Sequence, residues 1–313
     1  MPLNPQVETF LQQTYAAGFT PYEDLAPEAG RHQEHSDIPP ARPPEEMAAV
    51  EHRFIPGPTA DLPVRIYRPK HSEQPQPALI YFHGSGWMVS NIEINDPFSR
   101  ALAKNCGVVV IAVNYQKAPE HKFPIPMDDC YAATLWVFKH AERLGLDPKR
   151  IGIFGDSAGA NLAAAVALRC RDEDSADLAC QVLVYPPVQY SWHTASAEKY
   201  ATGFLLHKES MKYYWNHYLR SPADAIHPYC SPLLATDHSK LPATLLYCAE
   251  CDPLCDDCRL YADKLATSGV AVHYQRYPGT IHGFIKMLGV FDQADEFQRD
   301  VGAQVRELLA VKD

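Results

Sequence analysis

The pentapeptide Gly155-Asp-Ser-Ala-Gly159 limits the fold of this chain more than any other feature of its sequence. It follows the apolar segment 151–154, which is typical of a strand, and precedes segment 158–171, which is typical of a helix. A serine on so sharp a turn exposes its hydroxyl at the end of the strand, and glycines on either side prevent clashes. The helix directs free N–H groups and its positive dipole end toward the same place. We therefore predict a strand–turn–helix unit that presents Ser157 at the edge of a sheet.

Strand-like and helix-like segments alternate on both sides of this unit. Several of the strands are continuously apolar, as expected for a sheet that helices cover on both faces. The pattern predicts an α/β architecture with a mostly parallel sheet of about eight strands. The predicted strands are residues 50–55, 64–67, 78–82, 108–114, 151–154, 181–185, 244–248 and 270–277. The predicted helices are residues 96–104, 127–141, 158–171, 256–267 and 294–309.

Two segments stand outside this alternation and predict a separate layer of helices. Residues 1–45 begin with Asn4-Pro5, an expected helix cap followed by proline, and end in the proline-rich stretch 38–44. Residues 188–228 form a long insertion with one aromatic-rich helix. Because ligands bind at the carboxyl edge of such sheets, we expect both segments to form a cap there. The core is then 46–187 and 229–313. The aromatic stripe, which favours packing over substrate contact, comprises Met211, Tyr214, Trp215, Tyr218 and Leu219.

Two residues downstream of Ser157 are candidates for activating it. A serine hydroxyl is a weak nucleophile, so it needs a base within hydrogen-bond reach and an acid that orients the base. On a strand–turn–helix unit of this kind, the acid and then the histidine follow the serine on late loops. Asp252 and His282 satisfy this order, since each comes shortly after a late predicted strand. We predict that Ser157, His282 and Asp252 lie together.

Other residues could fill these two roles. Glu250 and Asp256 are alternative acids, but Glu250 lies nearer the strand and Asp256 falls in the next predicted helix. His83 is the nearest alternative base, although it precedes the serine and more plausibly bonds to backbone within its own loop. Asp156 adjoins the serine, and its side chain is expected to point away from the line between Ser157 and His282.

A third component is His83-Gly-Ser-Gly-Trp87, on the loop after the predicted strand 78–82. Small residues there allow backbone N–H groups to approach a substrate closely. Together with the amide of Ala158 they would form an oxyanion hole, in which a single donor stabilises the transition state by about 3 kcal/mol.

These motifs together resemble the hormone-sensitive-lipase-like carboxylesterases of the α/β-hydrolase fold. The resemblance rests on His83-Gly-Ser-Gly-Trp87, Asn114-Tyr-Gln-Lys-Ala-Pro-Glu120, Gly155-Asp-Ser-Ala-Gly159, Asp252-Pro-Leu254 and His282-Gly-Phe284, and it spans essentially the whole chain. It implies a helical cap, no cofactor, and hydrolysis of esters with short to medium acyl chains. It also implies Ser157 as nucleophile, His282 as base, Asp252 as orienting acid, and an oxyanion hole formed by the amides of Gly84, Ser85, Gly86 and Ala158.

The sequence departs from the family pattern at two places. Ser85 replaces the middle glycine of the usual His-Gly-Gly-Gly run, and Gln116-Lys117 replaces the usual Arg-Leu. If the first position requires a positive φ, a serine there is strained, and its side chain occupies space otherwise open to substrate.

Composition and charge argue against several classes of partner. The chain has 28 Lys and Arg against 38 Asp and Glu, a formal net charge of −10, so we expect no binding to nucleic acid or anionic lipid. The longest apolar run, residues 108–113, is far short of a membrane span, and the start resembles no signal peptide. We expect a soluble, cytoplasmic protein with no membrane partner.

Nine cysteines are present, and four of them crowd together at Cys248, Cys251, Cys255 and Cys258. The last three have a spacing that can hold an iron–sulfur cluster. No second cysteine pair and no long following domain support such a site, so we expect incidental buried thiols and no metal.

The sequence as a whole predicts a serine carboxylesterase acting on small-molecule esters through an acyl-enzyme. Amide, lactone or carbamate hydrolysis would use the same residues, and the sequence does not separate these reactions. A ligand-binding protein without turnover is disfavoured by the intact Ser157, Asp252 and His282. The sequence is also compatible with a homodimer.

Overall fold

A computed structural model describes residues 2–37 and 43–311 and contains a single eight-stranded sheet within them. The strand order is β1-β2-β4-β3-β5-β6-β7-β8. The pairs β1–β2 and β2–β4 are antiparallel, and all later pairs are parallel, which confirms the prediction of a mostly parallel sheet. The strands are β1 (Ala49–Pro56), β2 (Asp61–Arg68), β3 (Gln76–Phe82), β4 (Val109–Val113), β5 (Leu146–Asp156), β6 (Cys180–Val184), β7 (Ala243–Cys251) and β8 (Val272–Ile281).

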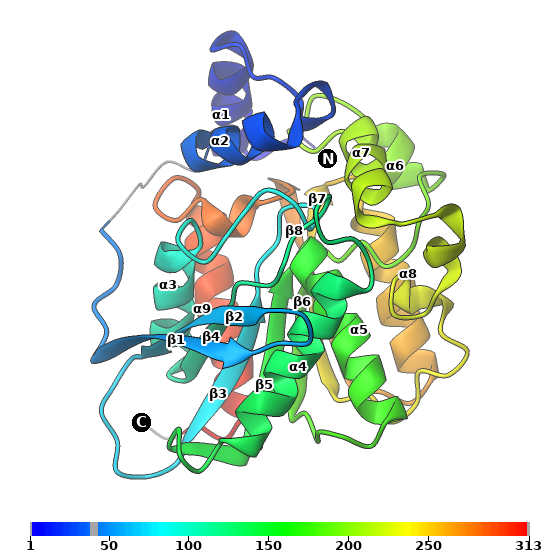
Figure 1. Cartoon of the computed structure of the whole chain (residues 1–313). Helices are drawn as coiled ribbons and strands as arrows, with labels where there is room; N and C mark the ends of the chain where they lie inside the picture. Colours follow the sequence, from blue (N-terminus) through cyan, green and yellow to red (C-terminus); the bar gives the residue numbers. More distant parts are fainter. Residues whose placement is uncertain (1, 38–42, 312–313) are drawn as a thin grey trace.

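Helices cover both faces of this sheet (Figure 1). The chain moves from β3 to β4 in one direction along the sheet and from β4 to β5 in the other. Because such crossovers are right-handed, the two connecting helices lie on opposite faces. One layer contains α3 (Asp96–Cys106), which packs on α9 (Asp292–Leu308). The other contains α4 (Ile125–Lys139), α5 (Ala158–Asp172) and α8 (Cys255–Thr267).

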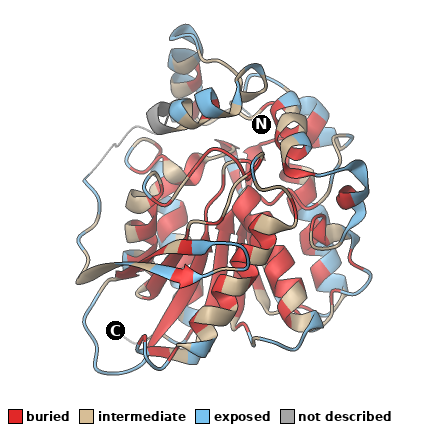
Figure 2. Cartoon of the chain, viewed as in Figure 1, coloured by how far each residue is buried: buried red, intermediate tan, exposed pale blue. Residues whose placement is uncertain are grey.

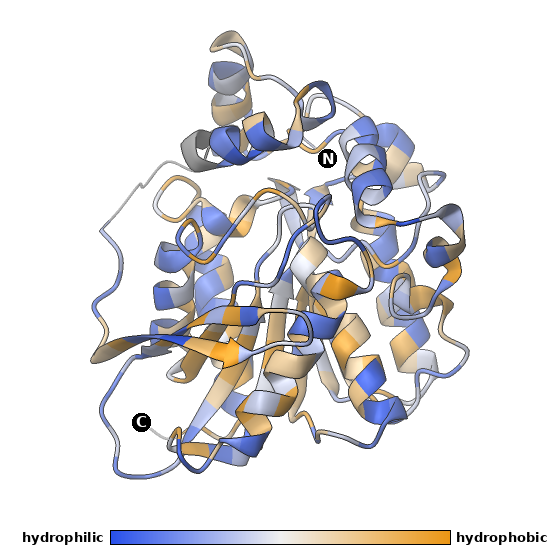
Figure 3. Cartoon of the chain, viewed as in Figure 1, coloured by the Kyte–Doolittle hydropathy of each residue, from blue (hydrophilic) through white to orange (hydrophobic). Residues whose placement is uncertain are grey.

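The core lies between these two layers. Every residue of β3, β4 and β6 is buried, as expected for strands covered on both faces. Figure 2 shows the buried strands at the centre, and Figure 3 shows hydrophilic and hydrophobic residues alternating along the helices that surround them. Strands β5, β7 and β8 extend beyond their predicted ends. In β8 the extra residues include Pro278 and Gly279, which are poor strand formers and lie at an irregularity of the pairing with β7, where Gly279 has a positive φ of 65°.

The two segments outside the core meet above the carboxyl ends of the strands (Figure 1). The first contains α1 (Pro5–Ala16), η1 (Tyr22–Asp24) and α2 (Pro27–Asp37), and the second contains α6 (Ala195–Lys199) and α7 (Lys208–Tyr218). As predicted, Asn4 caps α1 by accepting a hydrogen bond from the amide of Gln6. The segments contact each other through Tyr15 Oη and His207 Nε2, 3.3 Å apart, and through Tyr213, whose hydroxyl donates to the carbonyl of Leu25.

The remaining helical elements of the described chain are short 3-10 turns, η2 (Pro222–Ile226), η3 (Pro232–Leu234) and η4 (Phe284–Lys286). Residues 38–42 of the predicted proline-rich boundary lie outside the described residues. Across the described ranges, each helix is either too short or too polar to traverse a lipid bilayer.

Candidate active site

Ser157 stands on the tight turn between β5 and α5. Its φ of 53° is positive, a conformation that is rare for a residue with a side chain and is often found at functional sites. The turn depends on both glycines of the pentapeptide. A Cβ on Gly155 would lie 2.2 Å from the carbonyl oxygen of Gly159, and a Cβ on Gly159 would lie 1.9 Å from that of Phe82. The amide of Ser157 donates to the carbonyl of Val184 and holds the turn against β6.

The structure brings Ser157, His282 and Asp252 into one hydrogen-bonded chain. Ser157 Oγ lies 2.9 Å from His282 Nε2, and His282 Nδ1 lies 2.7 Å from Asp252 Oδ2. The other oxygen of Asp252 accepts from the amide of Leu254, and the whole residue is buried. Since the carboxylate can only accept, the imidazole carries its proton on Nδ1 and leaves Nε2 free to accept from the serine. This arrangement is the one a serine nucleophile needs for activation.

The alternative acids and base have other partners. Glu250 accepts from the amide of Gly279 and lies 3.7 Å from Arg276, and Asp256 accepts from the amide of Ser196. His83 stacks on Tyr115 with ring centroids 4.6 Å apart, and its Nδ1 lies 2.9 Å from the carbonyl oxygen of Gly84. Burial holds the pKa of His83 well below its ordinary value, so its ring is neutral.

The loop from His83 to Trp87 lies beside Ser157, but its amides are not equivalent. The amide of Gly84 donates to Asp156 Oδ1 at 3.0 Å, which corrects its inclusion among the predicted oxyanion donors. The amides of Ser85, Gly86 and Ala158 have no hydrogen-bond partner among the described residues. Their N–H groups are therefore available to an anion.

Ser85 has the strained conformation that the sequence analysis considered. Its φ is 101°, in a region that favours glycine. The hydroxyl compensates by accepting a hydrogen bond from the amide of Ser90 at 2.9 Å and by contacting the carbonyl of Gly84. The side chain is thereby held within its own loop.

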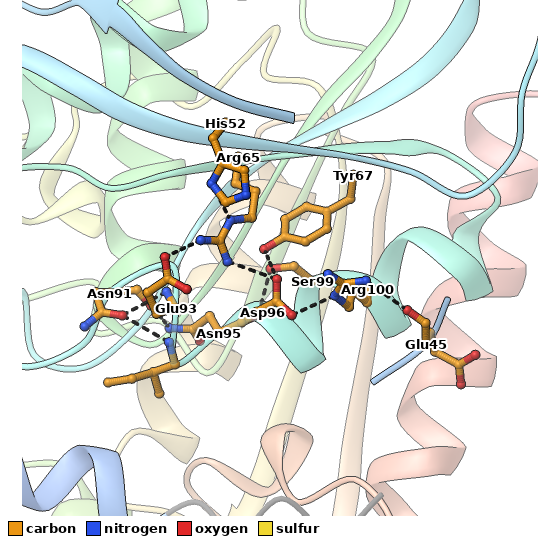
Figure 4. Close-up of polar contacts among 11 residues, drawn as sticks. Glu45, His52, Arg65, Tyr67, Asn91, Glu93, Asn95, Asp96, Ser99 and Arg100 are labelled. Atoms are coloured by element: carbon orange, nitrogen blue, oxygen red, sulfur yellow. Dashed lines mark hydrogen bonds and ion pairs between the residues drawn. The ribbon is translucent and has the colours of Figure 1, made fainter. Parts of the chain in front are cut away.

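The segment that follows this loop is anchored to the sheet by a polar cluster (Figure 4). Arg65 of β2 is almost fully buried and pairs with Glu93 and with Asp96, the latter at 3.0 Å. Asn95, between these two acids, lies 3.2 Å from the hydroxyl of Tyr81. The loop from His83 to Trp87, called the oxyanion loop below after its predicted role, therefore leads directly into a turn that these contacts attach to the sheet.

The second departure from the family pattern is a partly buried polar corner, in which Asp129 is fully buried. Gln116 donates from its backbone and side chain to Asp129. Lys117 donates to the side chain of Asn114 at 2.7 Å and to the carbonyl of Tyr115 at 2.9 Å. Burial lowers the pKa of Lys117 to about 8.

A cavity of about 730 Å³ opens at Ser157 and His282, which both line it. Met211, Tyr214 and Trp215 of α7 line it, so part of the aromatic stripe faces the cavity. Tyr218 packs instead on Trp87 of the oxyanion loop, with stacked rings 4.3 Å apart. The other aromatic residues of the wall are Phe10, Phe19, Tyr22, Trp87 and Tyr185.

Two residues of this wall were missed by the sequence analysis. Tyr185, at the end of β6, packs on the ring of His282 at 4.3 Å, and Lys286 lies 3.0 Å from Asp156. No motif marks either residue, because both reach the site only through the positions of β6 and η4.

The cysteines lie in the core, away from this wall. All nine are free and buried. Burial raises the pKa of the Cys251 thiol, and the same cause acts on the thiols of Cys170 and Cys180. In the described part of the chain, no three His, Cys, Asp or Glu side chains are arranged to hold a metal ion.

Comparison with known proteins gives concordant matches. A family model for the alpha/beta hydrolase fold matches residues 79–286. An ethyl acetate hydrolase of Pseudomonas putida is 36% identical over 307 residues, which are 95% of this chain and 96% of that protein. An arylesterase of Saccharolobus solfataricus is 35% identical over 286 residues, which are 91% of this chain and 93% of that protein.

Two solved structures match over nearly the whole length. An ester hydrolase from the metagenome of Lake Arreo, in complex with a bipyridine phosphonate derivative, has a TM-score of 0.95 at 35% identity and covers 99% of this chain and 100% of its own. A hyperthermophilic esterase of Pyrobaculum calidifontis has a TM-score of 0.93 at 36% identity and covers 98% of this chain and 99% of its own. The motifs, the fold and these relatives together show that the chain belongs to the hormone-sensitive-lipase-like carboxylic ester hydrolases of the α/β-hydrolase fold.

Proposed function

We propose that this protein hydrolyses carboxylic esters through an acyl-enzyme, with Ser157 as nucleophile, His282 as base and Asp252 as orienting acid. The continuous hydrogen-bond chain through these three residues carries the proposal. His282 Nε2 takes the proton from Ser157 as Oγ attacks the ester carbonyl, and Asp252 stabilises the imidazolium. The alcohol leaves with that proton. Water then attacks the acyl-enzyme with His282 again as base, releasing the acid and the free serine.

In this mechanism the tetrahedral oxyanion accepts hydrogen bonds from the amides of Ser85, Gly86 and Ala158. Two observations support this assignment: these amides have no partner within the described chain, and they flank Ser157 from the two loops beside it. Ala158 is the first residue of α5, so the helix dipole also favours negative charge there. Such preorganised donors act most strongly on charge that develops in the transition state.

The substrates that we propose are small esters with short to medium acyl chains. The aromatic side chains around the cavity suit apolar acyl and alcohol groups, and its volume is that of a small-molecule site. The names of the two relatives, an ethyl acetate hydrolase and an arylesterase, support the same class. Because residues of α1, η1, α2 and α7 line the cavity, we also propose that segments 1–45 and 188–228 form the cap. A homodimer and a cytoplasmic location stay predictions.

The test is the initial rate on p-nitrophenyl esters from acetate to laurate, measured with wild type and Ser157→Ala side by side. We expect turnover that is fastest at the shorter chains and a loss of about 10³-fold or more in kcat for the variant. Ser72→Ala, which changes an exposed loop serine, serves as the matched control and retains wild-type rates. Equal rates for a folded Ser157→Ala preparation and wild type would overturn the proposal.

A further inference from the structure

We propose that Lys286 is a positioning residue that balances the charge of Asp156 and so keeps the oxyanion loop in its active geometry. The inference rests on the proposed function. It concerns an ion pair in the wall of the cavity: Lys286 Nζ lies 3.0 Å from Asp156 Oδ2, and the two side chains are only 9% and 3% exposed. Lys286 belongs to η4, four residues after His282, and Asp156 directly precedes Ser157.

Asp156 is the point at which three loops of the site meet. Its Oδ1 accepts from the hydroxyl of Tyr81 at 2.7 Å and from the amide of Gly84 at 3.0 Å. Its Oδ2 pairs with Lys286. The carboxylate therefore joins the oxyanion loop, the serine turn and the loop of the base. Gly84 is suited to this role, because a Cβ there would lie 2.5 Å from Asp156 Oδ2 and 2.7 Å from its carbonyl oxygen.

The Asp156 carboxylate brings a buried negative charge close to Ser157. A buried carboxylate beside the oxyanion hole opposes the negative charge that develops on the substrate carbonyl oxygen. The Lys286 ammonium cancels most of that effect. Removing only one member of a buried ion pair leaves the other charge uncompensated, whereas removing both restores a neutral site. We therefore expect the effects on kcat of removing the Lys286 charge and the Asp156 charge to be strongly non-additive.

The test is a double-mutant cycle with Lys286→Gln and Asp156→Asn. The glutamine amide can still donate to Asp156, and the oxygen of the introduced asparagine amide can still accept from Tyr81 and Gly84, so each change removes charge while retaining hydrogen bonds. We expect Lys286→Gln to lower kcat by roughly ten- to a hundredfold with KM changed less than about threefold. The Ki of a trifluoromethyl ketone, which forms an oxyanion on Ser157, should rise by the same factor as kcat falls.

We expect kcat of the double variant to be at least about tenfold higher than that of Lys286→Gln, because the site is neutral again. Lys286→Arg keeps the charge and should retain more activity than Lys286→Gln, and this comparison remains decisive if the double variant does not fold. Lys212→Gln is the matched control, since Lys212 pairs with the exposed Glu209 on α7 and does not line the cavity.

Two results would overturn the inference: Lys286→Gln within twofold of wild type, or a double variant no faster than Lys286→Gln. Both results are measured as the part of the esterase turnover that is lost in Ser157→Ala. If wild type itself has no such turnover, the proposed function fails instead, so the two failures are distinguishable.

Discussion

Replacing Asp252 by asparagine should disable the proposed base without moving it. The buried carboxylate has two partners: Oδ1 accepts from the amide of Leu254 at 2.9 Å, and Oδ2 faces His282 Nδ1 at 2.7 Å. In the variant, the amide of Leu254 still needs an acceptor, so the asparagine oxygen takes the Oδ1 position. The asparagine NH₂ group then donates to Nδ1. His282 must carry its proton on Nε2, where it can no longer accept the proton of Ser157.

The opposite amide orientation would relieve His282 only by leaving the buried N–H of Leu254 facing another donor, at a cost of about 1–3 kcal/mol. The unproductive tautomer therefore dominates. An asparagine in place of the orienting acid lowers kcat by about 10⁴-fold, a barrier increase of about 5.5 kcal/mol.

The assay is kcat on p-nitrophenyl acetate, with the near-ultraviolet circular dichroism spectrum as the check on folding. Asp256→Asn is the matched control, because its asparagine can still accept from the amide of Ser196 and nothing links it to His282. We expect the control within about twofold of wild type. A folded Asp252→Asn enzyme that loses less than tenfold would refute the reasoning and remove Asp252 from its proposed role.

Two further predictions concern stability. Gly159→Ala should prevent normal folding, because its Cβ would lie 1.9 Å from the carbonyl oxygen of Phe82. Gly145 has a φ of 64° and open space around it, so Gly145→Ala should lower the free energy of unfolding by only about 1 kcal/mol. Similar melting temperatures for the two variants would contradict this prediction. Burial raises the pKa of Asp257 to about 7. Between about pH 4 and pH 7 the native state therefore keeps a proton on Asp257 that the unfolded chain has released. Because of this difference, Asp257 makes the free energy of unfolding fall as the pH rises through that range. Asp257→Asn keeps the acceptor for Gln189 and should raise the melting temperature at pH 8 much more than at pH 4, and an equal difference at both pH values would count against it.

The positions of Ser157, Asp252 and His282 along the chain could be predicted because local geometry limits each of them. The serine needs a tight turn with glycines, and the acid and base need loops after late strands. The amides of the oxyanion loop could not be sorted in this way. Gly84, Ser85 and Gly86 are three consecutive small residues, and only the approach of Asp156 to Gly84 distinguishes the first amide from the other two.

For the fold, too, local features could be predicted from the sequence and long-range contacts could not. Alternation of apolar and amphipathic segments is a local property, so it predicted every strand of the described sheet and the five helices that cover it. The short helix α6 was not predicted. The strand ends were wrong where β7 and β8 pair beyond Cys248 and Tyr277. The sequence by itself thus determined the class of fold, the mostly parallel character of the sheet and the motifs that carry chemistry. Only the tertiary structure decided which side chains meet across separate loops, such as Lys286 with Asp156 or Tyr185 with His282. Such contacts depend on how whole elements pack, and no short stretch of residues specifies that.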